Sequence, residues 1–308
     1  MTAVTVRVPA KVNLQLAVGP AREDGYHDLV NVFHAVSLFD EVTVIAAQPC
    51  AERGLVRLTA EGETHGNTAG VPLDATNLAA RAVHRLAAET DAGAPVDIQL
   101  TKRIPVAGGM AGGSADAAGA LVACATLWGA ELGHDRLLAL AADLGSDVAF
   151  PLVGGTAVGT GRGELLTPVP STGRYHWVFA LSGTGLSTGA VFGEYDRLRP
   201  DAPEPREDTA LMSALASGNA RALGAALRND LEPAALSLRP ELRSTLDAGR
   251  DADALGVIVS GSGPTCAFLA EDRAAAAHIA AALRESGHCE RALVAHGDVP
   301  GATVVCQE

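Results

Sequence analysis

The hydrophobic positions at the start of the chain recur with a period of two. Val4, Val6 and Val8 alternate with neighbours of a different character, and the alternation continues to Leu16. This period is typical of a strand with one buried face. Short apolar runs predict further strands at 29–38, 41–46, 96–100, 177–181, 255–259, 266–269 and 291–295, with shorter ones near Val56, Thr156 and Leu165.

Other segments show the period of a helix. We predict a helix from Asn77 to about Glu89, because Leu78, Val83 and Leu86 fall on one face. An Ala-rich helix is predicted at 115–128. Its apolar run is shorter than the roughly 18 residues of a membrane span, which favours a helix buried in a protein core. The remaining predicted helices are 135–144, 209–217, 219–228, 240–250 and 272–285.

The order of these elements indicates the fold class. Strands and helices are interleaved without a regular βαβα alternation, so we expect an α+β fold. A length of 308 residues favours two domains. The pair Gly154-Gly155 marks the expected boundary, between an N-terminal domain of residues 1–155 and a C-terminal domain of residues 156–308.

Composition and charge exclude several classes of protein. The net charge of −13 argues against a nucleic-acid partner, because neutralising phosphates needs a basic face. No signal peptide or membrane span is visible, and the five cysteines have no C-x-x-C spacing. We therefore expect a cytoplasmic chain with no membrane partner. Of its 23 basic residues only Lys11 and Lys102 are lysines.

The strongest chemical signal is the glycine-rich segment from Pro105 to Ser114, which lies between a predicted strand and a predicted helix. Glycines let a backbone approach an anion closely, and a helix N-terminus presents unpaired N–H groups. Together these features predict a phosphate-binding loop. Ser114 is placed to cap the helix, or to bind a phosphate oxygen or its metal ion. The alternative is a loop that only leads into a tightly packed helix. The spacing fits neither a Walker loop nor a Rossmann fingerprint.

Three separated segments resemble the motifs of the GHMP kinases, the family of galactokinase, homoserine kinase and mevalonate kinase. They are residues 9–14 (PAKVNL), residues 105–118 (PVAGGMAGGSADAA) and residues 260–266 (SGSGPTC). Residues 144–150 (LGSDVAF) are similar to the family's region around its catalytic aspartate. The resemblance implies a two-domain fold with the active site in the cleft between the domains, and ATP and Mg²⁺ as cofactors.

A further segment, residues 22–29 (REDGYHDL), narrows the choice within this family. It is similar to a signature of the branch whose small-molecule substrate is a cytidyl-diphosphate-linked methylerythritol, on the non-mevalonate route to isoprenoid precursors. The resemblance implies transfer of the γ-phosphoryl group of ATP to the 2-hydroxyl of that substrate. Two alternatives remain: a GHMP kinase for another small alcohol, such as homoserine or mevalonate, and a non-catalytic nucleotide-binding protein. The oligomeric state and the Mg²⁺ ligands stay open.

The resemblance also implies roles for two ionisable residues. Asp147 is expected to accept the proton of the attacking hydroxyl, and Lys11 to lie beside it and offset negative charge. The alternatives are a helix-capping aspartate and a solvated lysine at a strand end. Lys102 is assigned no role beyond the strand end before the glycine loop.

The expected binding residues follow the same motifs. ATP is expected to contact Pro105, Val106, Ala107, Gly108, Gly109, Met110, Ala111, Gly112, Gly113, Ser114 and Ala115. This loop departs from the family at Ala111, which replaces a glycine, and at Ala115, which replaces a hydroxyl residue, so Ala115 is expected to act through its backbone.

The substrate is expected to contact Asn13, Tyr26, His27, Thr188 and Phe192. Tyr26 and Phe192 would stack on the cytosine, and His27 would bind its edge. In the alternative interpretation, Tyr26 covers a core edge and His27 is a solvent-facing turn residue.

Overall fold

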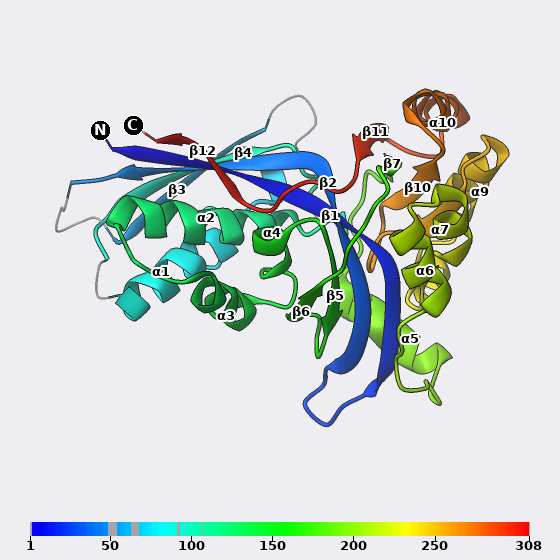
Figure 1. Cartoon of the computed structure of the whole chain (residues 1–308), viewed down its shortest axis with the longest axis horizontal. Coiled ribbons are helices and arrows are strands. Elements are labelled where there is room, and N and C mark those ends of the chain that lie inside the picture. The colour runs from blue at the N-terminus through cyan, green and yellow to red at the C-terminus, as the bar shows by residue number, and fades with distance from the viewer. Residues whose placement is uncertain (1, 49–53, 63–67, 91–92, 107, 308) are drawn as a thin grey trace.

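Two long strands run through the whole molecule. In the computed structural model, which describes residues 2–48, 54–62, 68–90, 93–106 and 108–307, β1 (Ala3–Ala21) and β2 (His27–Ala46) form one antiparallel hairpin (Figure 1). The two runs predicted at 29–38 and 41–46 are a single strand. A register shift pairs Pro9 with Phe39 and Ala10 with Val36, so the extra residues between them are absorbed as a bulge.

The first sheet is built around this hairpin, in the order β12-β1-β2-β4-β3, with β5 and β8 pairing to β2 and β1 and β6 pairing to β5. Its other strands are β3 (Val56–Gly62), β4 (Val96–Lys102), β5 (Thr156–Thr160), β6 (Leu165–Pro168), β8 (Arg228–Asn229) and β12 (Thr303–Gln307). The strand β12 was not among the predicted strands. All of its residues are exposed, so no hydrophobic period marks it in the sequence.

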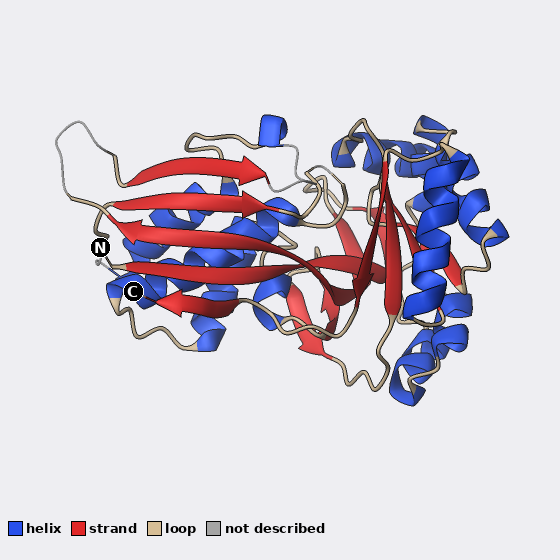
Figure 2. Cartoon of the chain, turned by 90° about the horizontal axis from the view of Figure 1, so that it is seen from above, coloured by secondary structure: helices blue, strands red, loops and turns tan. Residues whose placement is uncertain are grey.

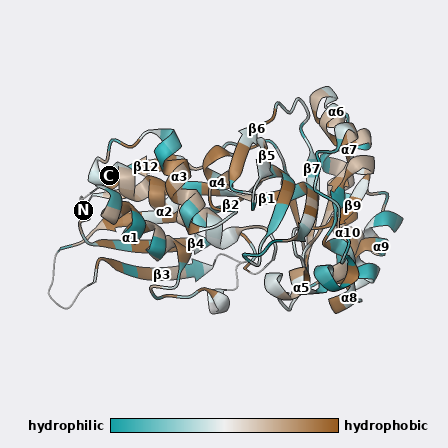
Figure 3. Cartoon of the chain, turned by 90° about the horizontal axis from the view of Figure 1, so that it is seen from below, coloured by the Kyte–Doolittle hydropathy of each residue, from teal (hydrophilic) through white to brown (hydrophobic). Residues whose placement is uncertain are grey.

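Helices cover one face of this sheet, and Figure 2 shows the opposite face without a helical layer. The helices that follow the sheet strands are α1 (Leu78–Thr90), α2 (Gly112–Trp128), α3 (His134–Leu144) and the short α4 (Phe150–Val153), with a 3₁₀ turn at Thr68–Gly70. Seen from below, α1 carries hydrophilic residues towards the viewer (Figure 3). None of the helices in the described part of the chain has the length and apolarity that a membrane span requires.

The helix α2 lies at the centre of this half of the molecule. Most of its residues are buried, as the apolar run predicted. Gly119 allows the close approach, since a Cβ atom there would lie 2.7 Å from a methyl group of Val42 and 3.1 Å from one of Val8. The middle of α2 is thereby packed closely against β1 and β2.

The second half contains a four-stranded sheet in the order β11-β7-β10-β9, covered by helices (Figure 1). Its strands are β7 (His176–Leu181), β9 (Gly256–Val259), β10 (Cys266–Ala270) and β11 (Arg291–His296). Its helices are α5 (Thr188–Leu198), α6 (Thr209–Ser217), α7 (Ala220–Ala226), α8 (Glu232–Leu238), α9 (Leu242–Asp251) and α10 (Arg273–Ser286).

The two-sheet architecture confirms the α+β fold class. Three α-helices of the described part of the chain, the four-residue α4 together with α5 and α8, were not predicted. The helix α5 contains Gly189 and Gly193, which are poor helix formers, and α8 has only seven residues. The division into domains 1–155 and 156–308 stays a prediction, and four strands beyond residue 155, namely β5, β6, β8 and β12, pair within the first sheet.

Candidate active site

A cavity of about 800 Å³ brings together residues from both halves of the chain. Most of the predicted site residues line it: Lys11, Asn13, Tyr26, His27, Pro105, Gly108, Gly109, Ala111, Gly112, Gly113, Ser114, Asp147, Thr188 and Phe192. Among the other predicted residues, Met110 and Ala115 are fully buried, and Val106 lines a smaller neighbouring cavity. Ala107 lies outside the described residues.

The glycine-rich loop ends earlier than predicted, because α2 begins at Gly112. The N-cap is Ala111, with φ 61°, and no side chain caps this end. The expectation that Ser114 caps the helix is therefore wrong. Ser114 lies in the first turn, and its side chain contributes to the cavity wall. The unpaired N–H groups and the positive end of the α2 dipole face the same space, which suits an anion.

The glycine-rich loop is in direct contact with the loop after β9. The Ser260 hydroxyl donates to the carbonyl oxygen of Gly109 at 3.3 Å. Gly109 has φ +71°, and a Cβ atom there would overlap the carbonyl oxygen of Ser260. On the other side, a Cβ atom on Gly261 would lie 3.3 Å from both Lys11 Nζ and Asn13 Oδ1. The 260–265 loop therefore lies against both the glycine-rich loop and the Lys11 side chain.

A chain of polar side chains lies on the floor of the cavity. Lys11 Nζ is 3.6 Å from Asp147 Oδ2, and it donates to Asn13 Oδ1 at 2.7 Å. Asn13 in turn donates to Asn31 Oδ1 at 2.8 Å. Lys11 is 4% exposed, so it is not a solvated strand-end lysine. Asn31, on β2, is a cavity residue that the sequence analysis did not identify, although the β1–β2 pairing brings it beside Asn13.

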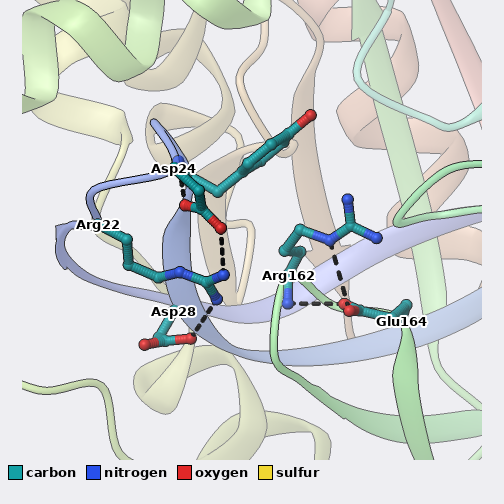
Figure 4. A network of polar contacts seen from close by, with 6 residues as sticks. Arg22, Asp24, Asp28, Arg162 and Glu164 are labelled. Carbon is teal, nitrogen blue, oxygen red and sulfur yellow. Dashed lines mark hydrogen bonds and ion pairs between the residues drawn. The ribbon is translucent and has the colours of Figure 1, made fainter.

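The hairpin turn that carries Tyr26 is held by charged side chains (Figure 4). Arg22 contacts the carboxylates of Asp24 and Asp28, and the Tyr26 N–H donates to Asp24 Oδ1 at 3.0 Å. These contacts lower the pKa of the Asp24 carboxyl, chiefly through the Tyr26 backbone N–H and then through Arg22. Tyr26 itself is 51% exposed, so it does not cover a core edge.

Arg162 is a second cavity residue that the sequence analysis did not identify. It lies in the turn between β5 and β6, where its backbone N–H donates to Glu164 Oε2 at 2.6 Å. Its guanidinium carbon lies 5.2 Å from the centre of the Tyr26 ring. The cavity therefore holds a cation beside its most exposed aromatic side chain.

His27 is buried at the first position of β2 and is not a solvent-facing turn residue. Its Nε2 is 2.7 Å from Asp196 Oδ1, and its ring lies 4.9 Å from that of Phe192 at an angle of 34°. Both partners come from α5, as does Thr188, whose hydroxyl is 2.9 Å from that of Ser262. The helix α5 thus brings the predicted substrate residues of the second half against the hairpin.

Lys102 is the last residue of β4, as predicted, but its side chain makes buried ionic contacts that the prediction did not include. Its side chain is 2% exposed and lies between the carboxylates of Asp40 and Asp116, 2.6 Å from Asp116 Oδ2. Asp116 lies within the glycine-rich motif, but nothing in the local sequence indicates that Asp40, which lies 62 residues before Lys102, is its other partner.

Comparison with known proteins agrees with this geometry. The pattern of the GHMP kinases N terminal domain matches residues 77–155, and that of the GHMP kinases C terminal region matches residues 211–289. A solved structure of homoserine kinase from Cytophaga hutchinsonii has a TM-score of 0.71 and covers 98% of this chain and 97% of that chain. At 21% identity this likeness concerns the fold alone. Fold, glycine loops and sequence patterns together define a GHMP kinase, an ATP-dependent phosphotransferase.

Proteins with higher sequence identity to this chain identify its branch of the GHMP kinases. A 4-diphosphocytidyl-2-C-methyl-D-erythritol kinase of Thermobifida fusca (strain YX) is 66% identical over 99% of both chains. One from Streptomyces coelicolor is 59% identical over 98% of this chain and 99% of the relative. A crystal structure of 4-(cytidine 5'-diphospho)-2C-methyl-D-erythritol kinase has a TM-score of 0.76 at 33% identity, covering 96% and 99% of the two chains. The chain belongs to the 4-diphosphocytidyl-2-C-methyl-D-erythritol kinases, and the resemblance of its motifs is confirmed.

Proposed function

We propose that this protein transfers the γ-phosphoryl group of ATP to the 2-hydroxyl of 4-diphosphocytidyl-2-C-methyl-D-erythritol. The observation that carries the proposal is the arrangement of the cavity. The Lys11–Asp147 pair, 3.6 Å apart, lies in the same space as the α2 N-terminus and the aromatic residues of the hairpin and α5. Phosphoryl transfer depends mainly on such positioning and on stabilisation of charge.

The reacting groups are assigned as follows. The Asp147 carboxylate accepts the proton of the acceptor hydroxyl, whose oxygen forms a new bond to the γ-phosphorus. The bond from that phosphorus to the β,γ-bridging oxygen breaks, and ADP leaves with the electron pair. The Lys11 ammonium offsets negative charge on the carboxylate and on the transferred group.

The triphosphate of ATP is assigned to the N-terminus of α2. Backbone N–H groups and the helix dipole supply positive potential there without any basic side chain from the loop itself. This suits a chain whose net charge of −13 would otherwise repel two anionic substrates.

Magnesium is expected to bind together with ATP. No group of three or more His, Cys, Asp or Glu side chains in the described part of the chain is arranged to hold a metal ion. Mg²⁺ often keeps several waters and takes only one or two protein ligands besides phosphates, so the cavity fits it. The Ser114 hydroxyl is the side chain that we assign to it. When bound, Mg²⁺ neutralises phosphate charge.

The cytidine end of the acceptor is assigned to the hairpin and α5. Tyr26 and Phe192 are positioned to stack on the cytosine, and His27 to bind its edge. Arg162 provides a cation for the diphosphate. Asn13 and Thr188 provide hydrogen-bonding groups for the acceptor.

We place this reaction in the cytoplasm, with small molecules and not nucleic acids as partners. The acidic net charge argues against a nucleic-acid partner, because binding to nucleic acid would need a basic face.

The proposal is tested with purified protein, ATP, Mg²⁺ and a panel of alcohols that contains the cytidyl substrate, homoserine and mevalonate. ADP release that requires the cytidyl substrate supports it, with the product identified as the 2-phosphate by ³¹P NMR. ADP release with homoserine or mevalonate alone, or with none of the alcohols, would overturn it.

A further inference from the structure

A buried group of three charged side chains lies directly beneath the glycine-rich loop. The Lys102 ammonium, at the end of β4, donates to Asp116 Oδ2 at 2.6 Å and also contacts Asp40 Oδ2. The three side chains are 2%, 0% and 3% exposed for Lys102, Asp40 and Asp116. They come from β4, β2 and α2, so three elements meet at a single cation.

Asp40 also holds the chain where it leaves β4. Its second oxygen, Oδ1, accepts hydrogen bonds from the backbone N–H groups of Arg103, at 2.6 Å, and of Ile104, at 2.8 Å. These are the first two residues after the strand and the first two of the segment that leads into the glycine-rich loop. One carboxylate therefore fixes both the Lys102 side chain and the start of that segment.

The other end of the segment is held through α2. Asp116 lies in the second turn of this helix, and a Cβ atom on Gly112, its first residue, would lie 3.4 Å from Lys102 Nζ. The ammonium thus contacts the helix at the point where the glycine-rich loop ends. Through its two carboxylate partners, Lys102 joins the start of the loop segment to its end.

The stability of the fold does not explain this arrangement. Two carboxylates and one ammonium are removed from water, and such ionic groups are often no more stabilising than apolar side chains of similar volume. Asp116 Oδ1 is buried without a hydrogen-bond partner among the described residues. Burial raises the pKa of this carboxyl to about 7, against the opposing effect of Lys102. The group is therefore costly, which suggests that its geometry is what matters.

We propose that the Asp40–Lys102–Asp116 group positions the nucleotide-binding loop, by fixing the end of β4 relative to the start of α2. The backbone N–H groups at residues 108–113 then point to the phosphates of ATP in advance of binding. Only a compact ammonium fits between the two carboxylates, since a planar guanidinium needs more room. These are positioning residues, because none of the three lines the cavity. The part of the proposal that concerns ATP rests on the proposed function.

The test uses Asp116→Asn in the full-length protein. The change removes one charge but leaves Lys102 paired with Asp40, so the chain is expected to fold, which its melting temperature checks. A neutral hydrogen bond is weaker than a charge-assisted one, so we expect the KM for ATP to rise about tenfold while the KM for the acceptor changes less than about twofold. Leu121→Ala is the matched control, because it removes core volume from the same helix without touching the charged group.

Hydrogen exchange separates this proposal from the proposed function. The backbone N–H groups of Arg103, Ile104, Val106 and residues 108–115 should exchange faster in Asp116→Asn than in the wild type and in Leu121→Ala, with no nucleotide present. Asp116→Glu, which keeps the charge but moves the carboxylate, is the second variant and should show the same local change. A wild type without kinase activity would refute the proposed function, yet this comparison would still decide on the loop. Unchanged exchange in both Asp116 variants, or equal effects of Asp116→Asn and Leu121→Ala on both KM values, would overturn the positioning role.

Discussion

Lys11 and Asp147 face each other on the cavity floor with Nζ 3.6 Å from Oδ2, and the carboxylate is the more accessible of the two groups. The Lys11 side chain is 5% exposed and that of Asp147 is 35% exposed. A hydroxyl entering the cavity can therefore reach the carboxylate while the ammonium supports it from the buried side. This asymmetry suits a base that must contact the substrate hydroxyl.

Replacing Asp147 by Asn should lower kcat by about 10²–10⁴-fold, because an amide cannot accept the proton of the acceptor hydroxyl. The KM values and the melting temperature should change little, since the side chain is not part of a packed core. Steady-state kinetics with the cytidyl substrate measure the effect. Asp143→Asn is the matched control, because Asp143 is paired with Arg85 on the surface. A near-normal kcat in Asp147→Asn would rule out the base role.

Lys11→Arg should impair catalysis even though the positive charge is retained. The Lys11 ammonium is held by Asn13 and abutted by Gly261, so a planar guanidinium cannot occupy the same point. We expect a loss of at least about tenfold in kcat, with Lys11→Met as the reference for complete removal of the charge. Full activity of Lys11→Arg would show that a point charge at this position is not required.

Tyr26→Ala should chiefly raise the KM for the cytidyl substrate. Stacking on an aromatic ring contributes about 1–3 kcal/mol, which corresponds to roughly 5–150-fold. Tyr26 is 51% exposed, so its removal should leave the melting temperature almost unchanged. Tyr26→Phe keeps the ring and serves as the control. If Tyr26→Ala bound the substrate as tightly as the wild type, the stacking assignment would fail.

Two glycines of the glycine-rich segment, one in the loop and one in the first turn of α2, should respond very differently to alanine. At Gly109 the backbone has φ +71° and a Cβ atom would overlap the Ser260 carbonyl oxygen, so Gly109→Ala must force the two loops apart. At Gly113 φ is not in the left-handed region, and the nearest atom to a Cβ would be a Leu78 methyl group at 3.9 Å. We expect ATP affinity to fall at least about tenfold in Gly109→Ala and to be nearly unchanged in Gly113→Ala. Isothermal titration with ADP distinguishes them, and equal affinities would contradict the packing argument.

Much of the fold and of the site could be predicted from the sequence. The alternation from Val4 to Leu16 and the periodic segment after Asn77 report burial directly, and the structure contains β1 and α1 at these places. The motif residues also predicted which side chains share the cavity, because the glycine loops and the Lys11 segment each carry a recognisable local pattern.

The rest depended on tertiary contacts that no local pattern records. Lys102 appeared to be a strand-end residue, since its partner Asp40 is distant in the sequence and becomes adjacent only when β2 pairs with β4. Arg162 and Asp196 reach the cavity through a turn and a glycine-containing helix. Ala111, and not Ser114, is the N-cap of α2. The helix begins three residues earlier than predicted, at Gly112 and Gly113, which are poor helix formers and so do not indicate a helix in the sequence.

His34, on β2, joins two segments that are distant in the sequence. Its Nδ1 is 2.7 Å from the Thr156 hydroxyl, and its Nε2 accepts a hydrogen bond from the backbone N–H of Asp298 at 3.2 Å. The ring is fully buried, and burial lowers its pKa from 6.5 to about 3. In the unfolded chain His34 therefore takes up a proton below about pH 6.5. In the folded chain it does so only below about pH 3.

The stabilisation from neutral His34 is thus fully present above the unfolded pKa and is lost as the pH falls between these two values. As the pH falls through this range, His34 alone should lower the free energy of unfolding by up to about 1.4 kcal/mol per pH unit. Urea unfolding between pH 4.5 and 7 measures the slope. His34→Gln, which cannot take up the proton, should have a shallower slope by nearly this amount, whereas His278→Gln, on the exposed face of α10, should match the wild type. Equal slopes for the wild type and His34→Gln would show that His34 is not the group that makes the free energy of unfolding depend on pH in this range.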